Sequence, residues 1–309
     1  MVKRVTPQRR GRSYYLATVG LAGALVSLPG SIASANEATA GAEKVLSETQ
    51  RLKELALDHW IAREIRLQRI AQRLQIAGAT FCRTEVAPIL GVVAIDPSSW
   101  HKSLRKTARA RFRGKKRIHV VDVMDGSAAD NAGVRVGDVL LELNGRRVES
   151  PAQVYGHRQR VLPTTRLKLA RGNERLTLEL KSVPGCRFPA SIRFQRAVNA
   201  FANGSFVYFT PQLMRFFKDD DNLALIVGHE IAHNIYWAGA RRSGWSARRV
   251  EMRADYVGLY LAAIAGYELT GGVFAKFDSM TEIENYSKSP RHPRSPKRVV
   301  NERKTIEEI

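Results

Sequence analysis

Cysteine is scarce in this chain of 309 residues, which contains only Cys82 and Cys186. Two cysteines exclude a disulfide-rich scaffold and a cysteine zinc finger. Long apolar runs are equally scarce, because only Tyr14–Ala35 is apolar and long enough to span a bilayer. The length and the 44% hydrophobic content are those of a globular chain with a sizeable core and about two domains.

Acidic residues are absent from the first 35 residues, which carry five cations. The basic start, the apolar run and Ala33-Ser34-Ala35 together form the pattern of a secretory signal peptide, residues 1–35. An uncleaved membrane anchor is the alternative, although Pro29 and Gly30 favour cleavage. We therefore expect an exported protein that is soluble after cleavage, or one tethered by this single segment.

Acidic residues are also absent from residues 101–117, which hold nine cations. This segment and the net charge of +21 favour anionic partners, namely nucleic acid, anionic lipid or acidic protein. Nucleic acid is not expected as a partner of an exported protein, and Phe112 alone offers a ring for base stacking. We expect 101–117 to be a flexible, solvated loop, with contact to an anionic membrane surface as the second interpretation.

The most informative stretch is residues 221–234, DNLALIVGHEIAHN. Aspartates at its start and an apolar run without proline predict a helix. His229 and His233 are four apart and project from one face, which is the spacing that lets two imidazoles share one Zn²⁺. Glu230, about 100° further round, can then act on water rather than on the metal. The alternative is a core helix that happens to carry two histidines.

A second helix, expected over residues 245–262, offers a third ligand. Glu251 and Asp255 lie four apart, so both carboxylates can point at the same object. Glu251 as third ligand would leave the fourth position for water, as in catalytic zinc sites. Asp255 is placed to accept the remaining N–H of a ligand histidine. The alternative for this pair is a solvated acidic patch.

The other informative stretch is residues 126–145, GSAADNAGVRVGDVLLELNG. It predicts a short helix that stops at Gly133, a turn at Gly137, an apolar strand and an Asn144-Gly145 turn. Further strands are expected on both sides of it. This order of elements closely resembles the PDZ domains of bacterial envelope proteases, over residues 86–184.

In PDZ domains, a loop ahead of the first strand binds the C-terminal carboxylate of a peptide, and the adjacent strand pairs with that peptide. The resemblance places this peptide-binding site at Ile89, Leu90, Gly91 and Val92. Protein or peptide substrates are thus the expected partners. The alternative is that the loop only closes the barrel.

The zinc motifs carry a second resemblance. His-Glu-Ile-Ala-His at 229–233, followed by Glu-Met-Arg-Ala-Asp at 251–255, resembles the minigluzincin zinc metalloendopeptidases, which are related to HtpX and the CAAX prenyl protease. Residues 199–209 resemble the family's stretch with an edge strand along the cleft, and 289–293 resemble its late His-Pro motif. The resemblance implies His292 as oxyanion stabiliser, with Arg298 as its support or as a structural ion-pair partner. Prenylated and membrane-embedded substrates are not expected, because no transmembrane helices surround the motifs.

The predicted fold class is α+β, with a mainly helical minigluzincin domain, a small edge sheet and an inserted PDZ β-barrel-like domain. The expected parts are a signal peptide (1–35), an amphipathic helix on the catalytic domain (36–85), the PDZ domain with its basic loop (86–184) and the metallopeptidase domain (185–309). A coiled coil or a membrane-surface helix remains open for 36–85. A Cys82–Cys186 bridge, permissible after export, would join the PDZ junctions; otherwise both are buried thiols.

Together with the expected signal peptide, the two resemblances imply an exported bacterial endopeptidase with one Zn²⁺ per chain, located in the periplasm or cell envelope. Its expected substrates are misfolded or unassembled envelope proteins, which the PDZ domain would bind or use for regulation. The alternative is a non-catalytic PDZ adaptor or chaperone with a structural zinc site. The intact Glu230 counts against that alternative, since a structural site needs no base.

Overall fold

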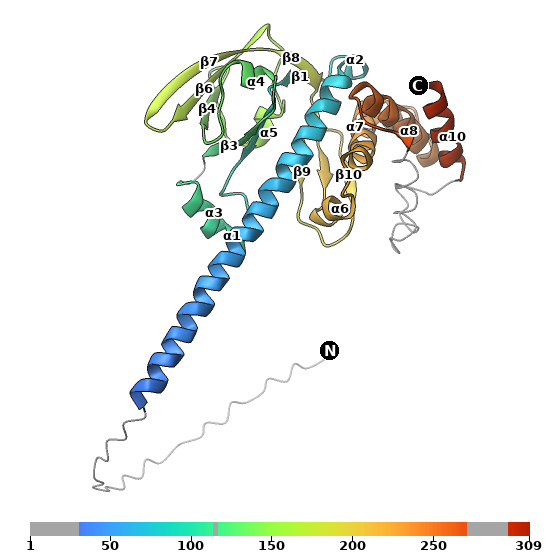
Figure 1. Cartoon of the computed structure of the whole chain (residues 1–309). Coiled ribbons are helices and arrows are strands. Elements are labelled where there is room, and N and C mark those ends of the chain that lie inside the picture. The colour runs from blue at the N-terminus through green and yellow to red at the C-terminus, as the bar shows by residue number, and fades with distance from the viewer. Residues whose placement is uncertain (1–30, 114–116, 271–295) are drawn as a thin grey trace, which may run out of the picture. The chain divides into compact units, whose positions relative to one another are not determined.

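The computed structural model describes residues 31–113, 117–270 and 296–309 (Figure 1). Most of the expected signal peptide lies outside these residues. Helix α1 (Ser31–Ala77) begins before the expected cleavage point, which follows Ala35. Among the described residues, no helix is long and apolar enough to cross a membrane.

The chain divides into two compact units, residues 1–49 and 50–309. The described part of the first unit is the start of α1, where Val45 and Leu46 are exposed.

Residues 86–183 contain a sheet with strand order β2-β3-β4-β6-β7, in which β5 pairs with β4. Strand β6 shows why these segments are strands, because Thr165, Leu167 and Leu169 alternate inward while the residues between them face outward. Ser127 caps the short helix α4 (Ala128–Asn131), and a second short helix, α5 (Pro151–Val154), follows β5 along the chain. The strands are β2 (Val92–Ile95), β3 (Ile118–Val123), β4 (Val139–Leu143), β5 (Arg146–Arg147), β6 (Thr164–Arg171) and β7 (Glu174–Lys181).

The basic segment 101–117 is a helix over most of its length, in contrast to the flexible loop that its charge predicts. Helix α3 spans Lys102–Arg111, and the His101 side chain accepts from the Ser103 N–H at its start. Lys, Arg, Leu and Ala are good helix formers, and a helix spreads its cations around its circumference. Ala108 is fully buried and Arg111 pairs with Asp58 of α1, so this segment is docked rather than freely solvated.

The ends of the PDZ-like segment are held together twice. Strand β1 (Val86–Ile89) pairs antiparallel with β8 (Val183–Cys186). Cys82, at the end of the short helix α2 (Ala79–Cys82), forms a disulfide with Cys186, with the Cα atoms 5.5 Å apart. The segment therefore enters and leaves the rest of the chain at one place.

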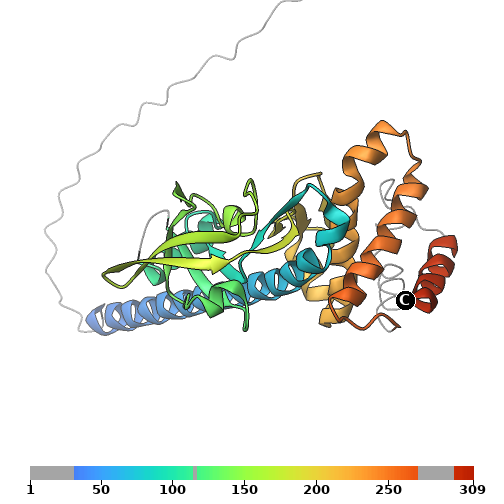
Figure 2. The ribbon, with the colours of Figure 1, turned by 90° about the horizontal axis from the view of Figure 1, so that it is seen from above.

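The remaining elements form a mainly helical body with its own core (Figures 1 and 2). Its three-stranded sheet has the order β10-β11-β9, with β10 antiparallel and β9 parallel to β11. Leu67, Ile70 and Leu74 of α1 belong to this core, so this part of the helix packs on the helical body. Its elements are β9 (Ala190–Ile192), β10 (Ala200–Ala202), β11 (Val207–Phe209), α6 (Pro211–Phe216), α7 (Asp220–Arg242), α8 (Ala247–Ile264) and α10 (Pro296–Glu308).

Candidate metal centre

Two capped helices supply the candidate ligands. Helix α7 contains His229, Glu230 and His233, and the Asp219 carboxylate accepts from the Asn222 N–H at its start, at 3.0 Å. Helix α8 contains Glu251 and Asp255, and the Ser246 hydroxyl caps its first turn. Such caps satisfy N–H groups that have no partner within the helix, and fix where each helix begins.

The two helices touch through a pair of glycines. A Cβ atom built on Gly258 would lie 2.8 Å from the backbone nitrogen of His229, and one built on Gly228 would lie 2.8 Å from the Gly258 carbonyl oxygen. Both distances are too short for a side chain to fit without a shift of backbone. These glycines let α7 and α8 approach closely enough for His229 to meet the carboxylates of α8. This close approach was not predicted from the sequence, although a glycine inside each of the two predicted apolar helices was a signal for it.

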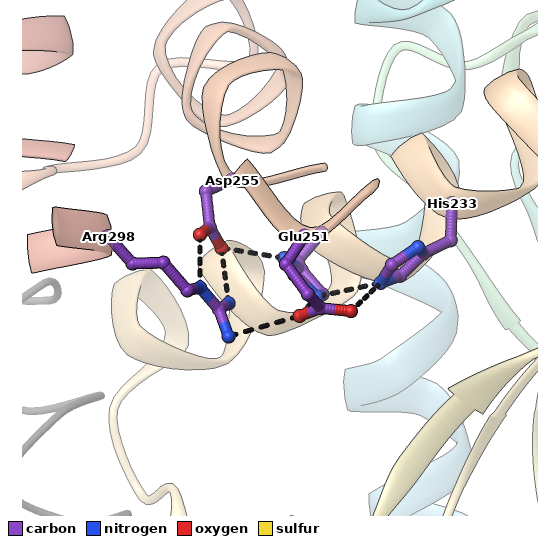
Figure 3. A network of polar contacts seen from close by, with 5 residues as sticks. His233, Glu251, Asp255 and Arg298 are labelled. Carbon is purple, nitrogen blue, oxygen red and sulfur yellow. Dashed lines mark hydrogen bonds and ion pairs between the residues drawn. The ribbon is translucent and has the colours of Figure 1, made fainter. Parts of the chain in front are cut away.

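Three donor atoms from these helices converge on one point. The Nε2 atoms of His229 and His233 are 2.9 Å apart, and the Glu251 carboxylate oxygens lie 3.6 Å and 3.3 Å from them, respectively. Figure 3 shows Glu251 between His233 and Arg298. His229 and Glu251 are buried, at 5% and 1% exposure. The three residues are thus grouped as they would be around a shared cation.

The donor set and its spacing fit zinc. Metal–ligand bonds of about 2.0–2.1 Å in a tetrahedron place neighbouring ligand atoms about 3.3 Å apart, close to the three separations found here. Two imidazoles and one carboxylate also form a typical catalytic zinc set, which keeps one position open. His229, His233 and Glu251 therefore have the chemistry and the geometry of a metal site.

Asp255 and Arg298 support the ligands from behind. An Asp255 oxygen lies 2.9 Å from Nδ1 of His229, the nitrogen that faces away from the donor cluster. Arg298 of α10 donates to both Asp255 oxygens, at 2.6 and 2.7 Å, and its Nη1 lies 3.0 Å from the Glu251 carboxylate (Figure 3). Arg298 is only 1% exposed. One guanidinium thus orients both carboxylates of α8 and offsets their charge.

Glu230 lies next to His229 on α7 and is 3% exposed. Asn234 follows His233 and ties the strand hairpin to this helix. Its Oδ1 accepts from the Gly204 N–H at 2.6 Å, and its Nδ2 donates to the Phe206 carbonyl at 3.0 Å. The hairpin joins β10 to β11, so Asn234 fixes an edge strand of the described three-stranded sheet beside the candidate ligands. No sequence pattern indicates this role of Asn234.

The other expected site residues lie elsewhere. Ile89, Leu90, Gly91 and Val92 form the end of β1, the β1–β2 connection and the start of β2, and all are buried. Gly91 has a φ of +78°, and a Cβ there would lie 2.1 Å from that of Ser127. His292 lies outside the described residues, so its expected role as oxyanion stabiliser stays a prediction.

Comparison with known families finds two matching segments. Residues 188–242 match peptidase family M48, and residues 119–156 match the PDZ domain family. No curated protein matches the chain. Peptidases of family M48 are metal-dependent, and the matched segment contains His229, Glu230 and His233. The predictions of a metallopeptidase segment and of a PDZ domain are thereby confirmed.

Two similar solved structures each match about a third of this chain. The HtrA3 PDZ domain bound to a phage-derived ligand is 18% identical, with a TM-score of 0.26, and the match covers 32% of this chain and 88% of that one. The HtrA-type protease AlgW with a decapeptide is 19% identical, with a TM-score of 0.25, and the match covers 32% of this chain but 29% of that protease.

Proposed function

We propose that this chain is a zinc-dependent endopeptidase. The observation that carries the proposal is the convergence of His229, His233 and Glu251 on one point, with Glu230 adjacent on α7. A Zn²⁺ ion held by these three residues would supply Lewis acidity, which acidifies water and polarises the scissile carbonyl.

The chain's own residues account for the remaining steps. Glu230 accepts the proton of the attacking water and later donates it to the leaving amine. Asp255 keeps the His229 ring oriented, and Arg298 holds Asp255 and Glu251 in place. In this scheme Arg298 is a positioning residue, because its guanidinium is engaged by two carboxylates. His292 remains our candidate for stabilising the oxyanion.

We further propose that the enzyme belongs to the minigluzincin group related to HtpX, and acts in the cell envelope on misfolded or unassembled proteins. The basic and apolar start of the chain supports export. The PDZ domain supports polypeptide substrates, since such domains bind peptides. N-terminal sequencing of the protein from the producing cell tests export: a chain that starts at Asn36 supports it, and an intact Met1 in a cytoplasmic fraction contradicts it.

The catalytic proposal is tested with the Glu230→Gln variant. Zinc content and hydrolysis of an unfolded protein such as reduced casein should be measured on the same preparations. We expect both proteins to hold one zinc, and the variant to be slower by about 10²- to 10⁴-fold, since it lacks the general base. Glu174→Gln, which changes an exposed carboxylate on β7, is the matched control. Equal rates for wild type and Glu230→Gln would overturn the mechanism, and zinc-loaded but inactive wild type would favour the adaptor.

A further inference from the structure

The outer edge of β2 is the place where a PDZ domain receives its peptide. Strand β2 stands at one end of the described sheet, and β3 pairs with its inner side. A C-terminal peptide would place its carboxylate at the β1–β2 connection and then run along the outer edge as an added strand. The backbone groups it would use are found at Gly91, Val92 and Ala94.

Two of these groups are bonded to a side chain of α1. The Gln72 Oε1 accepts from the Gly91 N–H at 3.0 Å, and its Nε2 donates to the Val92 carbonyl at 2.9 Å. Gln72 is 1% exposed, so this exchange takes place away from water. A primary amide offers the same acceptor and donor as a peptide group. Gln72 therefore does at this position what a peptide ligand would do.

The next two groups are bonded to Tyr155, which follows α5. Its hydroxyl oxygen accepts from the Ala94 N–H at 2.9 Å, and the hydroxyl donates to the Ala94 carbonyl at 2.7 Å. Ala94 is two residues after Val92, so its backbone groups face the same edge. Burial raises the pKa of Tyr155 well above its ordinary value, which keeps the hydroxyl protonated and able to donate. Both groups of Ala94 that could pair with a peptide strand are thus in use.

Helix α1 is held against the PDZ domain and the helical body together. Arg69 forms a two-point ion pair with Asp122 of β3, at 2.6 and 2.8 Å. On the other side, Gln68 donates to the Ala190 carbonyl and Gln75 to the Phe188 carbonyl. Both glutamines are as buried as Gln72. A change at the PDZ groove is therefore transmitted to α1, which also contributes to the core of the helical body.

We propose that α1 is an intramolecular ligand of the PDZ groove. Gln72 of α1, together with Tyr155 of the PDZ domain itself, occupies the hydrogen-bonding positions of a C-terminal peptide. The groove is closed to a free C terminus as long as these side chains stay in place. An incoming peptide has to displace both side chains, and the displacement of Gln72 loosens α1 from the PDZ domain. This assignment deepens the proposed regulatory use of the PDZ domain, but it stands whether or not the chain cleaves peptides.

Amide hydrogen exchange on the full chain tests the proposal. The Gly91 and Ala94 amides should be protected in the wild type, and Gln72→Ala should speed exchange at Gly91 by about tenfold or more, as expected when a buried hydrogen bond is lost. Gln75→Ala is the matched control, because it removes an equally buried amide of the same helix. The Met124 amide, which donates to the Gly91 carbonyl, reports on general opening of the sheet.

Unprotected Gly91 and Ala94 amides in the wild type would overturn the proposal, as would equal acceleration at Gly91 by Gln75→Ala. A second measurement uses short fluorescent peptides with a free C-terminal valine, leucine or phenylalanine and their amidated forms. The free-acid peptides should bind Gln72→Ala at least about tenfold more tightly than wild type. Equal tight binding to both proteins, dependent on the free carboxylate, would show that the wild-type groove is open.

Discussion

The metal centre and the PDZ groove both bury polar groups, but they combine them in opposite ways. In the metal centre, the Nε2 atoms of His229 and His233 and the carboxylate of Glu251 bring lone pairs together. Such a cluster is stabilised by a cation. In the groove, each donor meets an acceptor of the same chain, as Gln72 shows. The matching of donors to acceptors, rather than burial, distinguishes a site that needs a ligand from one that already has an internal one.

The largest expected effect comes from Glu251→Ala, which removes a ligand from the metal centre and leaves the groove untouched. Zinc affinity should fall by more than about 100-fold, the upper end of what loss of a supporting residue costs, and proteolysis should be lost. Competition with a zinc-buffering chelator measures the affinity, with Glu174→Ala as the control. If the Gly91 amide also lost its protection from hydrogen exchange in Glu251→Ala, the metal centre and the PDZ groove would be coupled, which would contradict their description as two independent sites.

Arg298→Met should give the next largest effect. It leaves Asp255 and Glu251 buried without their guanidinium, which should lower the free energy of unfolding by about 3–5 kcal/mol. Chemical denaturation of the zinc-free protein measures this loss. Lys304→Met, at an exposed position on the same helix, should cost less than about 0.5 kcal/mol. Similar losses in the two variants would show that Arg298 does not hold the carboxylates of α8 in place.

Gly258→Ala tests the contact that brings the ligands together. The added methyl group pushes against the backbone of His229, so we expect a loss of about 1–3 kcal/mol in the free energy of unfolding, with weaker zinc binding. Ile264→Ala, at an exposed position of α8, is the control and should change stability by less than about 0.5 kcal/mol. Unchanged zinc affinity in Gly258→Ala would mean that the helices can separate without disturbing the site.

The smallest effect is expected on the groove side, at Glu64. Burial raises the pKa of this carboxyl to about 7, although the Gln68 side chain that donates to it opposes the shift. The pKa of Glu64 is higher in the folded protein than in the unfolded chain. The protonated carboxyl therefore contributes fully to the free energy of unfolding at low pH, and this contribution is lost as the pH rises through about 7. At pH 8 the wild-type carboxyl is charged, so Glu64→Gln should be more stable than wild type. Because Glu64 is only partly covered, solvent screening limits the expected difference to about 1–2 kcal/mol.

Thermal unfolding of wild type and Glu64→Gln between about pH 4 and 8 measures this difference. The two proteins should differ little at the acid end, where the wild-type carboxyl is protonated. A difference that does not grow with pH would rule out a raised pKa at Glu64.

The candidate ligands could be predicted because local geometry determines their relation. His229 and His233 are four apart on a helix, and so are Glu251 and Asp255. That Arg298 bonds to both carboxylates could not be derived by the same route, because 43 residues separate it from Asp255 and no periodicity links them. The resemblance supplied Arg298 as a candidate, and left open whether it supports His292 or forms a structural ion pair. The contacts fit the ion pair.

The contacts of α1 with the PDZ groove could not be predicted from the sequence. The PDZ resemblance predicts residues 89–92 as the peptide-binding loop, and these residues connect β1 to the edge strand β2. That Gln72 fills the adjacent edge depends on how α1 lies across the sheet, which an amphipathic pattern cannot specify. The prediction of a flexible loop at residues 101–117 was wrong for a related reason. Its charge suggested a solvated loop, whereas contacts with α1, such as Arg111 with Asp58, hold α3 in place.

The most direct test of the central claim is a zinc titration of metal-free protein, followed by hydrolysis of an unfolded substrate at each step. Our account predicts no activity without metal, and a linear rise in activity that stops at one zinc per chain, with no such rise in Glu230→Gln. Hydrolysis that persists in the metal-free protein, or a fully loaded wild type that cleaves nothing, would contradict it.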